Sequence, residues 1–99
     1  DSIDLTKDAL SHGCYNMLAA PPFFYKGISQ EGIIAHFTYL IQGIGNHLLR
    51  LYLYHIPQQT SVSLEINTIQ TLQQESPQIV GIKDSGGNLE YTKALLIQF

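Results

Sequence analysis

A lysine follows an apolar segment at a place where a charged side chain is uncommon. Lys83 comes directly after residues 79–82, Ile-Val-Gly-Ile, which are typical of a short strand buried on both faces. An ammonium group is costly to bury unless it is paired or loses its proton. Desolvation lowers the pKa of a lysine, and the neutral amine is the nucleophile that attacks a ketone carbon. Lys83 is therefore a candidate Schiff-base lysine; the alternative is a lysine that reaches solvent or pairs with Asp84.

Tyr54 stands near the end of the preceding apolar segment, residues 49–56, which is rich in strand-forming residues and is closed by Pro57. If the two segments form neighbouring parallel strands, the Tyr54 phenol lies within several Å of Lys83. A tyrosine beside a forming carbinolamine can carry protons among the amine, the hydroxyl and the leaving oxygen. The alternative is an aromatic side chain that only fills space beside the strand ends.

A glycine-rich loop follows Lys83. Ser85, Gly86 and Gly87 precede Asn88, which can cap a helix. Exposed amides in such a loop can hold a carboxylate, and we expect Ser85 and Gly86 to bind substrate; the alternative is a plain tight turn. No G-x-G-x-x-G or P-loop spacing occurs, so no motif supports a nucleotide cofactor. A weaker hypothesis is a flavodoxin-like module that binds phosphate or a nucleotide with this loop.

Helical and strand patterns alternate along the chain. From Ser29 to Ile44 the apolar spacing is that of an amphipathic helix capped by Ser29. The other expected elements are helices at 4–11, from Ser63 towards Pro77 and from Asn88 onward, and strands at 17–20, 49–56 and 79–82. This alternation predicts an α/β fold with a parallel sheet and right-handed crossovers. Two architectures fit: a flavodoxin-like open sheet, or part of a (β/α)8 TIM barrel of about 250 residues.

Composition limits the classes of function. The chain has 99 residues, enough for a single unit at 1–99, with 44% hydrophobic and only 13% charged residues. The charged share is about half of the roughly 25% of ordinary soluble domains, which suggests that other protein covers part of the surface. The net charge is -3 without a basic patch, so nucleic acid and anionic membranes are poor partners. We expect a cytoplasmic chain, because no signal-peptide pattern is visible and the most apolar stretch, 32–57, is interrupted by polar residues.

The histidines and the cysteine do not indicate a metal site. The residues concerned are His12, His36, His47, His55 and Cys14. The histidines lack ligand-like spacing and the chain has one cysteine, so we expect neither a metal nor a cofactor. The cysteine also lacks a partner that would activate its thiol.

Four motifs, taken together, resemble one enzyme family. They are Pro-Pro-Phe-Phe-Tyr-Lys-Gly at 21–27, Ser-Gln-Glu-Gly at 29–32, Tyr-His-Ile-Pro at 54–57 and Gly-Ile-Lys-Asp-Ser-Gly-Gly at 81–87. Their order and spacing are similar to those of the dihydrodipicolinate synthase and N-acetylneuraminate lyase family, the class I, Schiff-base aldolases built on (β/α)8 barrels. The resemblance covers essentially the whole chain. It implies a central fragment of such a barrel, from helix 3 to helix 6, with three parallel strands.

The resemblance also implies roles for particular residues. Lys83 matches the lysine that forms an imine with pyruvate. Tyr54, the first residue of the family's Tyr-Asn-(Val/Ile)-Pro motif, matches the proton-relay tyrosine, and His55 replaces the common Asn. The implied partner is pyruvate or another 2-oxo acid, with an aldehyde as a candidate second substrate. Full-length relatives are commonly homo-oligomers, as tetramers.

Two departures bear on the substrate. An arginine that helps to bind the aldehyde's carboxylate in dihydrodipicolinate synthases is Gln59 here, and a relay tyrosine is Phe24, although Tyr25 is adjacent. Both favour a 2-keto-3-deoxy sugar-acid aldolase or a related lyase over a dihydrodipicolinate synthase. The family's Gly-Thr-Thr-Gly-Glu segment is absent, so we expect a fragment of a longer chain or a truncated reading frame. The alternative to a Schiff-base lyase is an inactive or assembly-dependent fragment with exposed strand edges.

Overall fold

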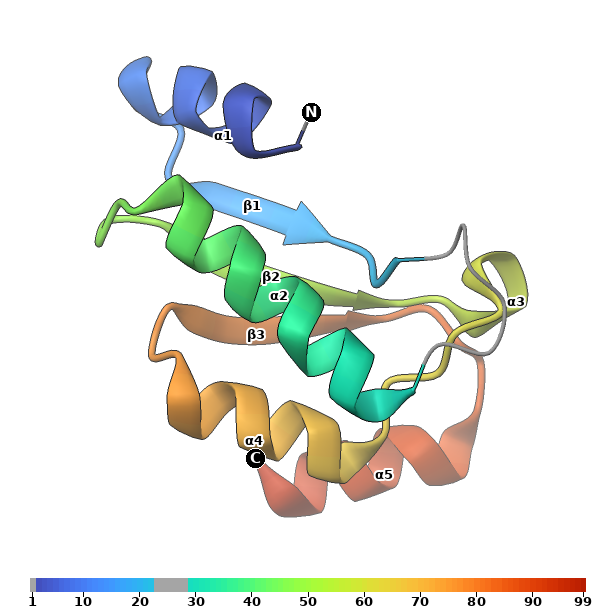
Figure 1. Cartoon of the computed structure of the whole chain (residues 1–99). Helices are drawn as coiled ribbons and strands as arrows, with labels where there is room; N and C mark the ends of the chain where they lie inside the picture. Colours follow the sequence, from blue (N-terminus) through green and yellow to red (C-terminus); the bar gives the residue numbers. More distant parts are fainter. Residues whose placement is uncertain (1, 23–28) are drawn as a thin grey trace.

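The structure, a computed structural model, describes residues 2–22 and 29–99. Within these ranges helices and strands alternate along the chain (Figure 1). The elements are α1 (Ser2–Ser11), β1 (Asn16–Ala19), α2 (Gln30–Ile44), β2 (Arg50–His55), α3 (Pro57–Thr60), α4 (Ile66–Glu75), β3 (Ile79–Asp84) and α5 (Leu89–Gln98).

The three strands form one parallel sheet in the order β1-β2-β3. Met17 of β1 stands opposite Leu51 of β2, which in turn stands opposite Ile79 of β3. The register of β2 and β3 then shifts by one residue, so that Tyr52 pairs with Gly81 and Val80 is the extra residue. The sheet confirms the prediction of parallel strands joined by helical crossovers.

Helices α2, α4 and α5 pack on the same face of this sheet. Leu51, Leu53 and His55 of β2 are buried on that face, whereas Tyr52 between them is exposed on the other. Figure 1 shows α2 and α4 side by side across the sheet, and Tyr91 of α5 stacks on His55. A doubly wound sheet carries helices on both faces. The described helices therefore do not form the flavodoxin-like arrangement. We call the uncovered side of the sheet the open face.

The core lies between the helix face of the sheet and helices α2 and α4. Its most completely buried large apolar side chains are Ile33, Phe37, Leu49, Leu51, Leu53, Leu64 and Leu72. Each such side chain stabilises the fold by about 1.5–3 kcal/mol relative to full exposure. Helix α2 contributes one continuous apolar stripe at helical spacing, as its sequence predicts. This core fixes the relative positions of β2 and β3.

Two predicted helix caps are confirmed. The Ser29 hydroxyl accepts a hydrogen bond from the N–H of Gly32 at 3.0 Å, and Gly45 ends α2 in the left-handed region at φ 63°. Asn88 Oδ1 accepts the N–H of Tyr91 at 3.1 Å and so caps α5. Both caps are local signals, with acceptor and donor three residues apart, and that is why the sequence displays them.

Helix α4 begins at Ile66 rather than at Ser63, where the sequence predicted its start. The preceding backbone is held by α2. Gln30 Nε2 donates to the carbonyl of Ser63 at 3.0 Å, and Gln30 Oε1 accepts from the N–H of Glu65 at 3.2 Å. A side chain of another helix therefore satisfies the amide at the start of α4, in place of a local cap.

The open face and helix α5 expose large apolar side chains. Leu18 and Val80 are exposed on β1 and β3, and Leu89, Leu96 and Ile97 are exposed on α5. Contiguous exposed apolar surface commonly marks a place that other protein covers. The small share of charged residues agrees with this arrangement.

Candidate active site

Tyr54 and Lys83 stand opposite each other near the ends of β2 and β3. Tyr54 and Lys83 each lie two residues after the pair Tyr52 and Gly81, which is on the open face. Because every second side chain of a strand points to the same face, Tyr54 and Lys83 also point to the open face. Nζ of Lys83 lies 4.9 Å from the centroid of the Tyr54 ring, within the range of a cation–π contact. The expected closeness of the two side chains is confirmed, and their chemical roles stay predictions.

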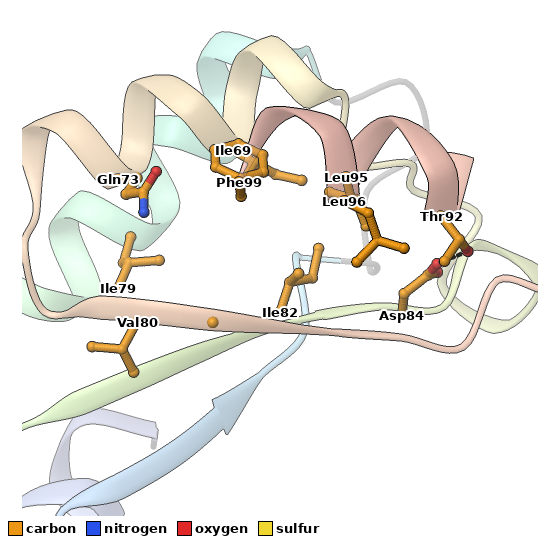
Figure 2. A pocket seen from close by; sticks show the side chains of 11 residues that line it. Ile69, Gln73, Ile79, Val80, Ile82, Asp84, Thr92, Leu95, Leu96 and Phe99 are labelled. Atoms are coloured by element: carbon orange, nitrogen blue, oxygen red, sulfur yellow. Dashed lines mark hydrogen bonds between the residues drawn. The ribbon is translucent and has the colours of Figure 1, made fainter. Parts of the chain in front are cut away.

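Lys83 is exposed, so the expectation of a strand buried on both faces was wrong for the described residues. Ile79 is buried, but Val80 is 48% exposed. Figure 2 shows the two side chains on opposite sides of β3, with Ile79 towards the helices and Val80 away from them. The reason is that helices cover only one face of the sheet, which leaves the Lys83 amine on the open face.

Asp84 is bound to the loop after β3 and not to Lys83. Its Oδ1 accepts the N–H of Gly86 at 3.1 Å, and its Oδ2 accepts the hydroxyl of Thr92 at 2.6 Å, the bond drawn in Figure 2. Successive side chains of a strand point to opposite faces, which separates the Asp84 carboxylate from the Lys83 amine. The alternative reading of Lys83 as the ion-pair partner of Asp84 therefore does not hold in the described structure.

The backbone amides of Ser85 and Gly86 already have partners within the protein. The N–H of Ser85 donates to the carbonyl of His55 at 2.9 Å, and the N–H of Gly86 donates to Asp84. The carbonyl of Ser85 accepts from Nε2 of Gln58. Substrate binding by Ser85 and Gly86 stays a prediction. Because both backbone amides are already paired, the prediction now concerns the Ser85 hydroxyl and the shape of the loop.

Gly81 makes room for an aromatic ring on the open face beneath Lys83. A Cβ added at this position would lie 2.8 Å from Cδ2 and 2.9 Å from Cε2 of Tyr52. We expect Gly81→Val to lower the free energy of unfolding by about 1–3 kcal/mol, because the ring must move out of a packed position. Chemical denaturation of the variant measures this loss; an unchanged midpoint would contradict the close approach. Gly13→Ala is the control. A Cβ added at Gly13 meets no atom within 4 Å, and φ is 87°, so this substitution tests backbone strain without a steric clash.

An apolar groove among the described residues does not lie next to Lys83. It has a volume of about 310 Å³ and lies between α4, α5 and β3 on the helix face of the sheet, as Figure 2 shows. Ile69, Ile82 and Leu95 are among its lining residues, and Asp84 and Thr92 stand at one end. The groove and the Lys83 amine are therefore on opposite sides of β3.

The sequence also indicated roles for Gln59, Phe24 and Tyr25. Gln59 is exposed in α3, beside the end of β2. Phe24 and Tyr25 lie outside the described residues.

In the ranges that the structure describes, no three His, Cys, Asp or Glu residues come together in a way that could hold a metal ion. None of the described helices is long and apolar enough to cross a membrane.

Comparison with known proteins decides the family. The model of the dihydrodipicolinate synthetase family matches residues 1–99. The chain belongs to this family. It is 38% identical, over 91% of its length, to the 4-hydroxy-tetrahydrodipicolinate synthase of Wolinella succinogenes, and 36% identical over 97% to an uncharacterized DapA-like lyase of Chloroflexus aurantiacus. The crystal structure of dihydrodipicolinate synthase from Agrobacterium tumefaciens superposes with a TM-score of 0.89 at 37% identity, over 97% of the chain.

The family also settles the architecture. The sheet and its helices are part of an α/β TIM barrel, as the motifs predicted, and its three neighbouring parallel strands are an arc of that barrel. The chain spans 29% and 32% of the two curated relatives and 34% of the Agrobacterium tumefaciens chain. In a barrel the open face of this sheet is the inner face, and Tyr54 and Lys83 lie at the strand ends at which TIM-barrel enzymes commonly place their active sites.

Proposed function

We propose that this chain carries the Schiff-base lysine of a lyase or aldolase that acts on pyruvate or a related 2-oxo acid. One observation carries the proposal: Lys83 and Tyr54 face each other on neighbouring parallel strands, with the amine 4.9 Å from the ring centroid. They occupy the strand ends at which TIM-barrel enzymes place their chemistry. Membership in a family of synthases and lyases supports the same assignment.

Lys83 supplies the nucleophile in this proposal. Its neutral amine attacks the ketone carbon of the 2-oxo acid, and a proton passes from nitrogen to oxygen to give a carbinolamine. Loss of water, with the nitrogen lone pair forming the new double bond, yields the imine. The protonated imine then accepts the electron pair of a breaking C–C bond, or loses a proton to give the enamine that forms one.

Tyr54 moves protons in these steps. Its ring lies beside the Lys83 amine, and general acid–base catalysis needs a proton donor within reach of the carbinolamine hydroxyl. We assign the orientation of the 2-oxo acid to the hydroxyl of Ser85, in the loop after Lys83. Gln59 in place of an arginine removes a carboxylate-binding charge, which favours a sugar-acid aldolase over a dihydrodipicolinate synthase. We further propose that the natural protein that carries this sequence is a homo-oligomer in the cytoplasm.

The proposal is tested by reduction of the imine in the natural protein that carries this sequence. Sodium borohydride is added with and without pyruvate, and residual activity and peptide masses are measured. We expect pyruvate-dependent inactivation and a reduced pyruvyl adduct on the peptide that contains Lys83. An adduct on Lys93 of α5 instead, or activity that survives reduction with pyruvate, would remove Lys83 from the reaction.

A second candidate is that residues 1–99 on their own are inactive and depend on assembly. The exposed apolar side chains on the open face and on α5 favour it, because an uncovered inner face promotes association. We expect the 99-residue chain to sediment as oligomers and to form no pyruvate adduct. A sharp thermal transition of a monomer, together with an adduct on Lys83, would contradict this second candidate.

A further inference from the structure

The ring of His55 is fixed beneath the loop that follows Lys83. His55 ends β2 with its side chain on the helix face, where it is 3% exposed. Its ring stacks on that of Tyr91 of α5, with centroids 4.1 Å apart and planes inclined by 18°. Its Nδ1 accepts the backbone N–H of Leu64 at 3.3 Å. Because this donor requires a lone pair on Nδ1, the neutral ring carries its proton on Nε2.

The other edge of the ring supports the loop. A Cβ added at Gly86 would lie 3.2 Å from both Cδ2 and Nε2 of His55, so the loop backbone packs directly on this edge. The carbonyl of the same histidine accepts the N–H of Ser85 at 2.9 Å. Nε2 of Gln58 also donates to the Ser85 carbonyl, which adds a second hydrogen bond to the loop. The two residues that the chain places after Asp84 are thus held by the end of β2.

We propose that His55 is a positioning residue, whose neutral ring holds the loop after Lys83 and thereby sets where the Lys83 amine stands relative to Tyr54. The inference rests on the proposed function of Lys83 and adds a residue to it. His55 touches neither the amine nor the phenol, because its side chain lies on the opposite face of the sheet. Its effect passes through β3 and through the segment from Lys83 to Gly86.

The charges around His55 give the proposal a pH signature. Burial lowers the pKa of His55 below 6.5, and the carboxylate of Asp84 on β3 opposes that shift only in part. Burial and the same carboxylate raise the pKa of Tyr91 on α5, so its phenol stays neutral and donates to the carbonyl of Leu64. Among the described residues, Asp84 acts on the ring through its charge, and Tyr91 stacks on it. Protonating Nδ1 removes the acceptor for Leu64 and buries a charge.

The direction of the pH effect follows from this shift. The unfolded histidine binds its proton near pH 6.5, whereas the folded one binds it only at lower pH. The contribution of His55 to stability is therefore complete above pH 6.5 and is lost as the pH falls below it. In the folded protein the ring takes up its proton only at its own lowered pKa, and at that pH the loop loosens and imine formation at Lys83 slows.

The test compares the natural protein with its His55→Phe and His55→Asn variants between pH 5 and 8. Phenylalanine keeps the stack on Tyr91 but offers Leu64 no acceptor. Asparagine offers an acceptor oxygen but does not titrate. The first readout is the rate of imine formation at saturating pyruvate, trapped by borohydride. The second is hydrogen exchange of the peptide that contains residues 84–87, which does not depend on any reaction.

We expect His55→Phe to slow imine formation at saturating pyruvate by about 10- to 100-fold, because small misplacement of a nucleophile has effects of that size. Exchange of the loop peptide should rise in parallel. His55→Asn should keep the rate within a few-fold and lose the acid decline below pH 6.5. If His55→Phe does not fold, Tyr91→Leu removes the stack instead and is expected to act in the same direction.

Two results overturn the inference. One is an unchanged rate and pH profile in His55→Phe with only a lower melting temperature, which would make His55 a packing residue. The other is unchanged loop exchange in that variant. Absence of any adduct in the unmodified protein would instead refute the proposed function of Lys83, and the exchange measurement would still show whether His55 holds the loop.

Discussion

Replacing Lys83 by arginine is expected to lower kcat by on the order of 10⁴-fold or more, because the guanidinium cannot form the imine through which the reaction passes. The variant should fold normally. Lys83 is exposed on the open face, and arginine keeps both its charge and its contact with the Tyr54 ring. Steady-state kinetics of the purified natural protein measure the loss, and circular dichroism checks the fold.

Lys93 provides the matched control for this prediction. It is an exposed lysine of α5, and it lies on the helix side of the sheet. Lys93→Arg should leave kcat and the pyruvate adduct unchanged. A Lys83→Arg variant with more than a tenth of the original activity would show that the reaction does not need an imine at this residue.

Replacing Tyr54 by phenylalanine is expected to lower kcat by about 10²–10⁴-fold, the usual share of general acid–base catalysis. The ring that stands beside the Lys83 amine remains, so its packing and the position of the lysine are retained. Only the proton-carrying hydroxyl is lost. The adduct should still form, but the single-turnover rate of imine formation should fall, because the carbinolamine hydroxyl leaves without its donor.

Tyr52 is the control for Tyr54, because it lies two residues before Tyr54 on β2, on the same face and opposite Gly81. Tyr52→Phe keeps the ring beside Gly81 and removes a hydroxyl that the proposed reaction does not use. Its kcat should stay within a few-fold of the original. Equal losses in the two variants would indicate a general disturbance of the open face, and a fully active Tyr54→Phe would exclude the tyrosine as proton carrier.

Local patterns account for the parts of the fold that the sequence predicted. The helix from Ser29 was predicted because its cap and its apolar stripe lie within a few turns of one another. The pairing of Tyr54 with Lys83 followed from two apolar segments that each end at a reactive side chain and from the regular spacing of parallel strands. Both inferences need only sequence distance and ordinary geometry.

The features that the sequence did not predict depend on distant contacts. The helix cap of α4 comes from Gln30, far away in the chain, so the local signal at Ser63 was misleading. The short helix α3 was missed because Pro57 was interpreted only as the end of a strand, although proline is also suited to a first helical turn. The burial of His55 depends on Tyr91 and Leu64, which the pattern around it does not reveal.

The exposure of Lys83 has a similar explanation. Four apolar residues in a row favour a strand buried on both faces, and that reading holds for a strand in a closed barrel. In the described chain only the helix face is covered, so Val80 and Lys83 are left exposed. The chain covers about a third of its relatives, and their remaining strands complete the barrel around the open face.

The most direct test of the central claim is a crystal structure of the natural protein soaked with pyruvate. We expect continuous electron density from Nζ of Lys83 to the ketone carbon, with the Tyr54 hydroxyl within hydrogen-bond reach of the reacting atoms. Pyruvate bound without a covalent link to Lys83, or seated in the groove between α4, α5 and β3, would contradict it.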